Sequence, residues 1–288
     1  MNPYTQAVIS GLMTGATYTL LGMGLVLVFR TSRILNLAHG ETFVVAAVTV
    51  VLLTGAKVPL WASLATAVLT TILFYTGLHR FVLRQRSHWP QGTLILITLG
   101  AAFLMRGLMI LLIGTDPASF APLFAGPPIR FAGGAMPPQG IALVLIGFGV
   151  SIAVGFFLAR TRRGKELLAT AENPQAAELL GVNVENARLL AYGISGALGA
   201  ISAILLVPLI SIDFQSGLAM TMRGFIAAAI SGMSPMRTVA SGFALGIFES
   251  MVGAVLGALF QDPVIFCVLI LVAVWQSRKI RFGGGQRA

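Results

Sequence analysis

The chain has 288 residues, of which 57% are hydrophobic and only 10% charged, and its formal net charge is +10. Because a soluble domain ordinarily carries about a quarter charged residues, this composition excludes a water-soluble surface of ordinary polarity. Long apolar runs between short polar segments are instead typical of helices in lipid. The basic residues border apolar runs without interleaved aromatic residues, which excludes nucleic acid as a partner.

Nine apolar runs predict the membrane helices. They cover residues 6–29, 34–54, 60–78, 92–114, 140–159, 189–210, 217–234, 238–260 and 263–276. A span needs about 20 residues, and the two weakest candidates are the last run, which is short, and 217–234, which contains Arg223. We expect an all-α polytopic bundle of about 8–9 transmembrane helices that forms a single transmembrane domain over residues 1–288. The lower number applies if 217–234 is re-entrant.

The positions of the basic residues predict the orientation of the bundle. Four groups border apolar runs: Arg30/Arg33, Arg80/Arg84/Arg86, Arg160/Arg162/Arg163/Lys165/Arg188 and Arg278/Lys279/Arg281/Arg287. Cytoplasmic loops carry an excess of Lys and Arg, so we expect a periplasmic N-terminus and a cytoplasmic C-terminus. The loop 115–139 then lies outside, and its Pro and Gly content indicates an irregular, partly embedded segment. Residues 1–10 lack a basic n-region and a cleavage pattern, so the first run should persist in the mature protein.

Small residues recur at four-residue spacing within the apolar runs. The pairs are Gly11/Gly15, Gly193/Ala197, Ser195/Gly199, Gly242/Gly246 and Gly253/Gly257. On a helix each pair makes a flat stripe against which another helix packs closely. They predict a tight bundle and no particular activity.

A polar segment, Asn36-Leu37-Ala38-His39-Gly40-Glu41, begins the second apolar run. Ionisable groups at membrane depth are costly and mark pathways or interior contacts. If the segment is helical, Asn36, His39 and Phe43 share one face and Glu41 points elsewhere, while Gly40 allows a bend. Two interpretations stay open: Asn36, His39 and Glu41 line or gate a substrate pathway, or they form a solvated helix start. No second histidine completes an H-E-x-x-H motif, so no metal site is expected.

Four further charges lie within or beside apolar runs. We expect Arg106 and Glu249 to pair across the bundle, which would lower the cost of burying both. Arg223 and Asp213 are expected to snorkel or to pair locally.

Residues 160–188 form the long polar segment between two apolar runs. Asn173 is a strong N-cap followed by proline, and a glycine at 181 suits a helix end, so two short helices joined at Asn173 are predicted. The second helix has an apolar face that either packs on the chain's own loops or lipid, or docks into a cytoplasmic partner. The candidate coupling residues are Gly164, Lys165, Glu172, Asn173, Pro174, Ala176, Leu179, Leu180 and Gly181.

The sequence contains no motif of a membrane enzyme. It has no G-x-x-x-x-G-K-[ST] loop and no G-x-S-x-G elbow. A chain that moves solute uphill without its own nucleotide site needs an ion gradient or a separate ATPase. An ion-coupled transporter is the weaker alternative because Glu249 is the single central carboxylate. A third possibility is a scaffold that transports nothing.

Two motifs resemble those of the LivH-type permease subunits of ABC importers for branched-chain amino acids. The N-terminal motif comprises Gly11-Leu12, Gly15, Tyr18, Gly24-Leu25 and residues 36–41. The second comprises residues 161–164, Ala171-Glu172, Ala176-Ala177 and residues 181–183. The match in order and spacing covers nearly the whole chain. Departures are Arg30 in place of a usual glycine, Thr42 in place of a common aromatic residue, and the glycine-poor stretch 231–235.

The resemblance implies a mechanism and partners. A periplasmic binding protein would deliver branched-chain or related hydrophobic amino acids, and this chain with a LivM-like permease would form the pathway through the bacterial inner membrane. Two ATPase subunits, which bind ATP and Mg²⁺ themselves, would dock beneath residues 164–181. This chain would then hold no cofactor. The same kind of importer for urea, short amides or aromatic acids is the alternative.

Overall fold

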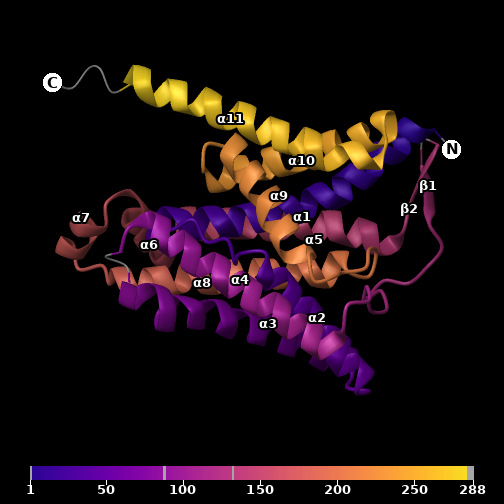
Figure 1. The fold of residues 1–288 in the computed structure, drawn as a ribbon, viewed down its shortest axis with the longest axis horizontal. Helices are drawn as coiled ribbons and strands as arrows, with labels where there is room; N and C mark the ends of the chain where they lie inside the picture. Colours follow the sequence, from indigo (N-terminus) through magenta and orange to yellow (C-terminus); the bar gives the residue numbers. More distant parts are fainter. Residues whose placement is uncertain (1, 87–88, 132, 284–288) are drawn as a thin grey trace.

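The computed structural model describes residues 2–86, 89–131 and 133–283, which form eleven α-helices and one short β-hairpin (Figure 1). The helices are α1 (Pro3–Ser32), α2 (Glu41–Gly55), α3 (Leu60–Gly77), α4 (Gln91–Ile113), α5 (Pro138–Arg160), α6 (Arg162–Glu172), α7 (Pro174–Leu179), α8 (Val184–Leu206), α9 (Ser216–Ile230), α10 (Pro235–Leu256) and α11 (Gln261–Gly283). The hairpin strands are β1 (Ile129–Phe131) and β2 (Gly134–Met136). A π-helical turn (Leu78–Leu83) and two 3₁₀ turns (Arg84–Arg86, Ala258–Phe260) complete the described elements.

The prediction of a polytopic helical bundle is confirmed. In the described part of the chain, six helices are long and apolar enough to cross a membrane: Pro3–Ser32, Leu60–Arg86, Gln91–Ile113, Pro138–Arg160, Val184–Leu206 and Pro235–Leu256. Three shorter apolar helices are Glu41–Gly55, Ser216–Ile230 and Ala258–Val272. At 1.5 Å per residue, the 15 residues of α2 or α9 extend about 22 Å, less than the roughly 30 Å hydrocarbon core. Their buried starts, at Glu41 and Gly217, lie inside the bundle.

The first helix is the centre of the bundle. In its apolar window 78% of the residues are buried, compared with 22% for α3 with its extension and for α4. Figure 1 shows α1 running between α10 and α11 on one side and α3 and α8 on the other. The core of the protein is thus built around α1, and α4 lies at the periphery.

The close packing of α1 and α10 depends on glycines on both helices. A Cβ added at Gly11 would meet the backbone of Ile247, and one added at Gly246 would meet the backbone of Gly15. At Gly15 the added atom would lie 2.8 Å from the Cα of Phe243. The two glycine stripes read from the sequence therefore face each other and allow direct backbone contact.

The outer loop differs from the expected irregular segment because it contains the β1–β2 hairpin. The strands pair antiparallel with Ile129 opposite Met136. The hairpin is attached to the start of α1: Asn2 N–H donates to the Gly133 carbonyl at 3.0 Å, and Ala135 N–H donates to Gln6 Oε1 at 2.9 Å. Strands of three residues are too short to leave an alternating pattern, so the sequence does not reveal them.

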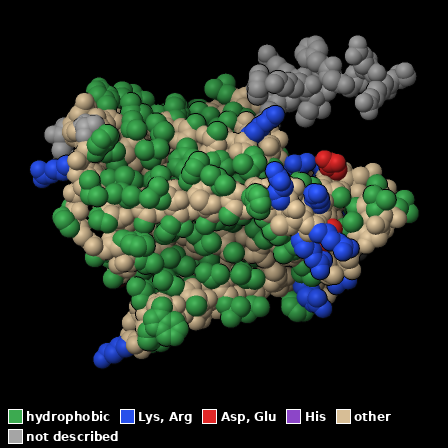
Figure 2. Space-filling view, turned by 180° about the vertical axis from the view of Figure 1, so that it is seen from behind, with side chains coloured by type: hydrophobic (Ala, Val, Ile, Leu, Met, Phe, Trp, Pro, Cys, Tyr) green, Lys and Arg blue, Asp and Glu red, His purple; other side chains and the backbone are tan. Residues whose placement is uncertain are grey.

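Basic side chains gather at the end of the bundle that carries α6 and α7, while apolar side chains cover its flank (Figure 2). The hairpin lies at the opposite end (Figure 1). The charge asymmetry on which the orientation prediction rests is therefore present in the fold. The side chains of the last basic group, Arg278 to Arg287, lie outside the described part of the structure.

We predict that Gly246→Ala destabilises the bundle by about 1–3 kcal/mol, because its methyl group would press on the backbone of Gly15. Gly149→Ala is the matched control: Gly149 is also helical, and its added Cβ meets nothing within 4 Å. Thermal unfolding of both variants in the same detergent checks the prediction. Equal thermal unfolding midpoints for the two variants would contradict the assigned contact between α1 and α10.

Candidate functional site

The polar segment between α1 and α2 is not helical. The chain leaves α1 through Arg33, whose φ of 58° is left-handed, and residues 37–40 form a turn before α2 begins at Glu41. Side chains replace the missing helical bonds: Asn36 Oδ1 accepts from Ala38 N–H at 2.9 Å, and Thr98 Oγ1 accepts from Leu37 N–H at 3.1 Å. The common face expected for Asn36, His39 and Phe43 therefore does not form, because these local bonds compete with the helix.

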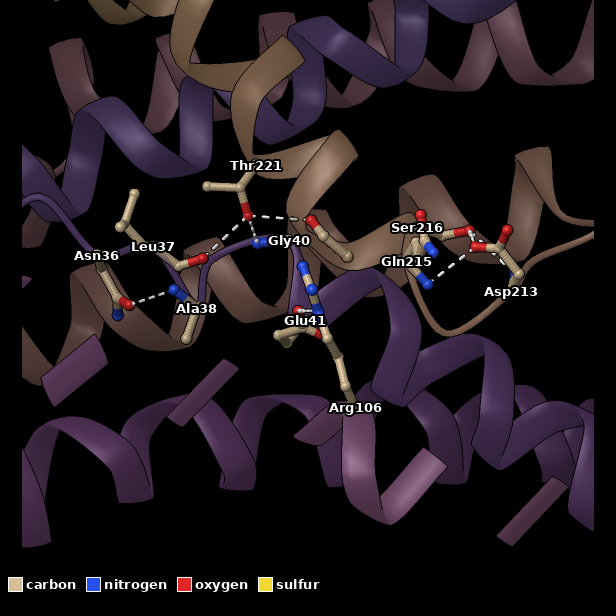
Figure 3. Close-up of polar contacts among 11 residues, drawn as sticks. Asn36, Leu37, Ala38, Gly40, Glu41, Arg106, Asp213, Gln215, Ser216 and Thr221 are labelled. Carbon is tan, nitrogen blue, oxygen red and sulfur yellow. Dashed lines mark hydrogen bonds and ion pairs between the residues drawn. The ribbon is translucent and has the colours of Figure 1, made fainter. Parts of the chain in front are cut away.

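One hydroxyl on α9 connects this segment to the second short helix. Thr221 Oγ1 accepts from Gly40 N–H at 2.7 Å and lies 3.2 Å from the Leu37 carbonyl and 3.0 Å from the Gly217 carbonyl (Figure 3). A Cβ at Gly40 would meet the Gly217 carbonyl oxygen. Gly40 is therefore needed for close approach to α9 and not only for bending.

His39 is fully buried and bonded on both ring nitrogens. Its Nε2 lies 2.8 Å from the Leu21 carbonyl and therefore carries the proton, so its Nδ1, 3.1 Å from Tyr75 Oη, accepts. The carbonyl belongs to α1 and the tyrosine to α3. His39 therefore joins both helices to the non-helical segment between α1 and α2, residues 33–40, which we call the break. The alternative of a solvated helix start is wrong, since His39 and Glu41 are each 0% exposed.

Glu41 is buried beside Arg106 of α4, with 3.8 Å between its Oε1 and Arg106 Nε (Figure 3). This separation is too long for a hydrogen bond. Both Glu41 oxygens and Arg106 Nε lack a hydrogen-bond partner among the described residues. A Cβ at Gly217 would meet the Glu41 carboxylate, so the acid lies against the first turn of α9. The positive ends of α2 and α9 also favour its negative charge.

The predicted pair of Arg106 with Glu249 is wrong. Glu249 instead accepts from Arg223 Nε at 3.0 Å, and Arg223 also reaches Asp262 at 2.7 Å. Arg223 thus pairs with acids of α10 and α11 rather than within its own helix. The sequence gives the depth of a charge along its helix but not which neighbouring helix that charge faces.

The polar segment 160–188 has the two predicted short helices, α6 and α7. Thr161 Oγ1 caps α6 at Gly164 N–H (3.0 Å), and Asn173 Oδ1 caps α7 at Ala176 N–H (3.1 Å). Pro174 opens α7, and Gly181 follows it with a φ of 81°. Gly164 is buried against the Phe157 backbone, whereas Lys165, Glu172, Ala176 and Gly181 are exposed.

The two leucines at the end of α7 face outward. Leu179 is 90% exposed and Leu180 is 82% exposed, whereas Ala177 is buried. The alternative in which this apolar face packs on the chain's own loops is therefore wrong. An exposed pair of large aliphatic side chains next to basic residues is a surface that a partner or the lipid interface covers.

Several residues that hold the break were missed by sequence reasoning. Thr98, Thr221 and Gly217 come from α4 and α9, far from residues 36–41 along the chain, and Tyr75 comes from α3. Threonine is common in apolar helices, so its presence gives no signal. The four-residue spacing of Gly217 and Thr221, a small residue beside a hydroxyl on one helix face, is the one pattern that the sequence contains.

We predict that Thr221→Val destabilises the protein by about 1–3 kcal/mol, because Gly40 N–H loses its buried acceptor. Thr221→Ser keeps the hydroxyl and should retain most of the stability. Unfolding midpoints of the two variants, compared with the parent, measure the difference. If valine and serine behave alike, the hydroxyl does not hold the break.

Comparisons with known proteins agree with this architecture. The family described as "Branched-chain amino acid transport system / permease component" matches residues 7–273. The permease BraD of Pseudomonas aeruginosa is 26% identical over 96% of this chain and 95% of its own length. LivH of Salmonella typhimurium is 24% identical over 93% and 92%, respectively. Both relatives are high-affinity branched-chain amino acid transport system permease proteins.

Two further similarities extend this set. LsrC of Escherichia coli, an autoinducer 2 import system permease protein, is 30% identical over 89% of this chain and 70% of its own length. The structure of PsaBC from Streptococcus pneumoniae in complex with Fab covers 94% of this chain and 91% of that chain, with a TM-score of 0.55 and 14% identity. This last similarity shows a shared fold. With the family match over residues 7–273, the chain belongs to the branched-chain amino acid transport permease family and is a multi-pass permease subunit of an ABC importer rather than an enzyme.

Proposed function

We propose that this permease carries branched-chain or related hydrophobic amino acids across the bacterial inner membrane, driven by separate ATPase subunits that bind the ATP and Mg²⁺. The family match over residues 7–273 carries the proposal. Its support in the structure is the exposed apolar end of α7, which would receive the force from an ATPase. A periplasmic binding protein and a second, LivM-like permease would complete the importer.

The coupling surface of this proposal consists of α6 and α7. Their caps at Thr161 and Asn173 hold the two helices rigid, and Gly164 fastens α6 to the end of α5. A displacement of Leu179 and Leu180 by the ATPase would therefore be transmitted through α6 and α7 to α8. This helix begins at Val184 and packs against α1 and α3. Two further coupling candidates, Lys165 and Glu172, offer exposed charges around this surface.

The break between α1 and α2 is proposed as the part of the solute pathway that this chain supplies. Asn36 and His39 act as positioning residues, because their side-chain bonds are used within the chain. Glu41 has unused hydrogen-bonding capacity and is the residue of the three that is free to meet a solute. Discontinuous helices whose ends meet within a bundle are a recurrent way to bind polar solutes in membranes.

The substrate class is tested by uptake into proteoliposomes that contain this chain, the second permease and the ATPases. We expect leucine uptake that needs both ATP and the binding protein, and weak inhibition by urea and by aromatic acids. Uptake by this chain alone under a proton or sodium gradient would favour the ion-coupled alternative. Preferred uptake of urea, a short amide, an aromatic acid or autoinducer 2 would refute the amino-acid assignment.

We predict that the double substitution Leu179→Glu with Leu180→Glu weakens ATPase binding by at least about tenfold, because a docking groove would have to bury two charges. Both side chains are exposed, so the stability of the permease should not change. The matched control replaces both leucines with Met and should retain binding. Co-purification and titration of the ATPase in detergent measure the effect, and full retention with the glutamates would refute the docking assignment.

The proposed orientation places the N-terminus in the periplasm and the C-terminus in the cytoplasm. It follows from the basic side chains at the end that carries α6 and α7, which the positive-inside rule assigns to the cytoplasm (Figure 2). A green fluorescent protein fused after Ala288 should fluoresce, and alkaline phosphatase fused at the same point should be inactive. The opposite result would invert the topology.

A further inference from the structure

An apolar groove of about 230 Å³ lies between α2, α3 and α4. Apolar side chains line most of it, and among them are Val44, Val48, Leu52, Phe74, Met105 and Met109. Its walls carry little polar surface and suit an aliphatic group of a few carbons.

The groove begins about one helical turn from the buried charge pair. On α2, Val44 and Val48 follow Glu41 at three and seven residues, and on α4, Met109 follows Arg106 at three. Residues at these spacings lie on one face of a helix. Glu41 therefore lies on the face of α2 that lines the groove, one helical turn before Val44, and Arg106 lies beside the edge of the groove, one turn before Met109.

This charge pair has hydrogen-bonding capacity that the chain does not use. The two groups are 3.8 Å apart, and both carboxylate oxygens and Arg106 Nε are buried without a hydrogen-bond partner among the described residues. By contrast, Arg223 and Glu249 are hydrogen-bonded at 3.0 Å. A buried ion pair kept only for structure gains most when its geometry is good, so the loose pair is better explained by a ligand.

We propose that Glu41, Arg106 and the groove form a binding site for an α-amino acid with an aliphatic side chain. The Glu41 carboxylate would accept from the ammonium group, Arg106 would donate to the carboxylate, and the side chain would enter the groove. This inference rests on the proposed function and identifies the residues that recognise the solute. A zwitterion replaces the charge pair with two new pairs, whereas a neutral solute leaves both buried charges unmatched.

The experiment measures binding of radiolabelled leucine to the assembled, nucleotide-free importer in lipid nanodiscs without the binding protein. Leucinamide lacks the carboxylate and 4-methylpentanoate lacks the ammonium group. We expect each analogue to compete at least about tenfold more weakly than leucine, because one charge-assisted pair is lost. Equal competition by either analogue would overturn the proposal, as would the absence of leucine binding by an importer that transports leucine.

Variants separate a ligand site from a structural ion pair. Glu41→Gln and Arg106→Gln should each weaken leucine binding at least about tenfold, and the double variant should bind no better than either. If the pair is purely structural, the double variant should recover the leucine affinity that each single variant loses, since neither charge is then left unpaired. Glu249→Gln is the matched control, which removes another buried carboxylate and should keep the leucine affinity.

The same preparations distinguish failure of this inference from failure of the proposed function. If the parent importer takes up leucine with ATP and the double variant binds it with unchanged affinity, the site is wrong and the function stands. If the parent takes up no amino acid, the proposed function is wrong, and the site falls with it. Unfolding midpoints of all variants show that lost binding does not reflect lost folding.

Discussion

The fold depends on one constraint: backbone amide and carbonyl groups inside a membrane need partners, because lipid offers none. Ordinary helices meet it by themselves, but the stretch from Arg33 to Gly40 leaves the helical path in the middle of the bundle. The amides of Ala38, Leu37 and Gly40 are satisfied by Asn36, Thr98 and Thr221, which belong to the segment itself, α4 and α9. The break is therefore a product of the whole bundle, and its shape is fixed by three separate elements.

Much of the architecture was predictable, since apolar length, caps and the position of basic residues are local properties. Each predicted apolar run overlaps a helix, and the joint between α6 and α7 lies at Asn173 because asparagine and proline specify a helix start wherever they occur. The partner of a buried charge is not local. Arg106 meets Glu41 rather than Glu249 because the rotation of α4 about its axis depends on packing that no short pattern encodes.

Glycine has two separate uses in this protein. Along α1 and α10 it brings two long helices into backbone contact, so α10 packs directly on the central helix α1. At Gly40 and Gly217 it instead lets two helix starts meet beside a carboxylate. The four-residue stripes identify the first use, whereas single glycines such as Gly40 show their purpose only once α9 lies against them.

The hydroxyl of Thr221 has a consequence for how solute preference can change. Because it bonds Gly40 and approaches Leu37 and Gly217 together, the starts of α2 and α9 are joined as one unit with no spare room for side-chain variation. The groove between α2, α3 and α4 has the opposite character, since exchanges among valine, leucine and methionine there would disturb no backbone hydrogen bond. If the groove binds the solute as proposed, a lineage of such permeases can acquire new solutes by altering the walls of the groove while the junction of α2 and α9 stays unchanged.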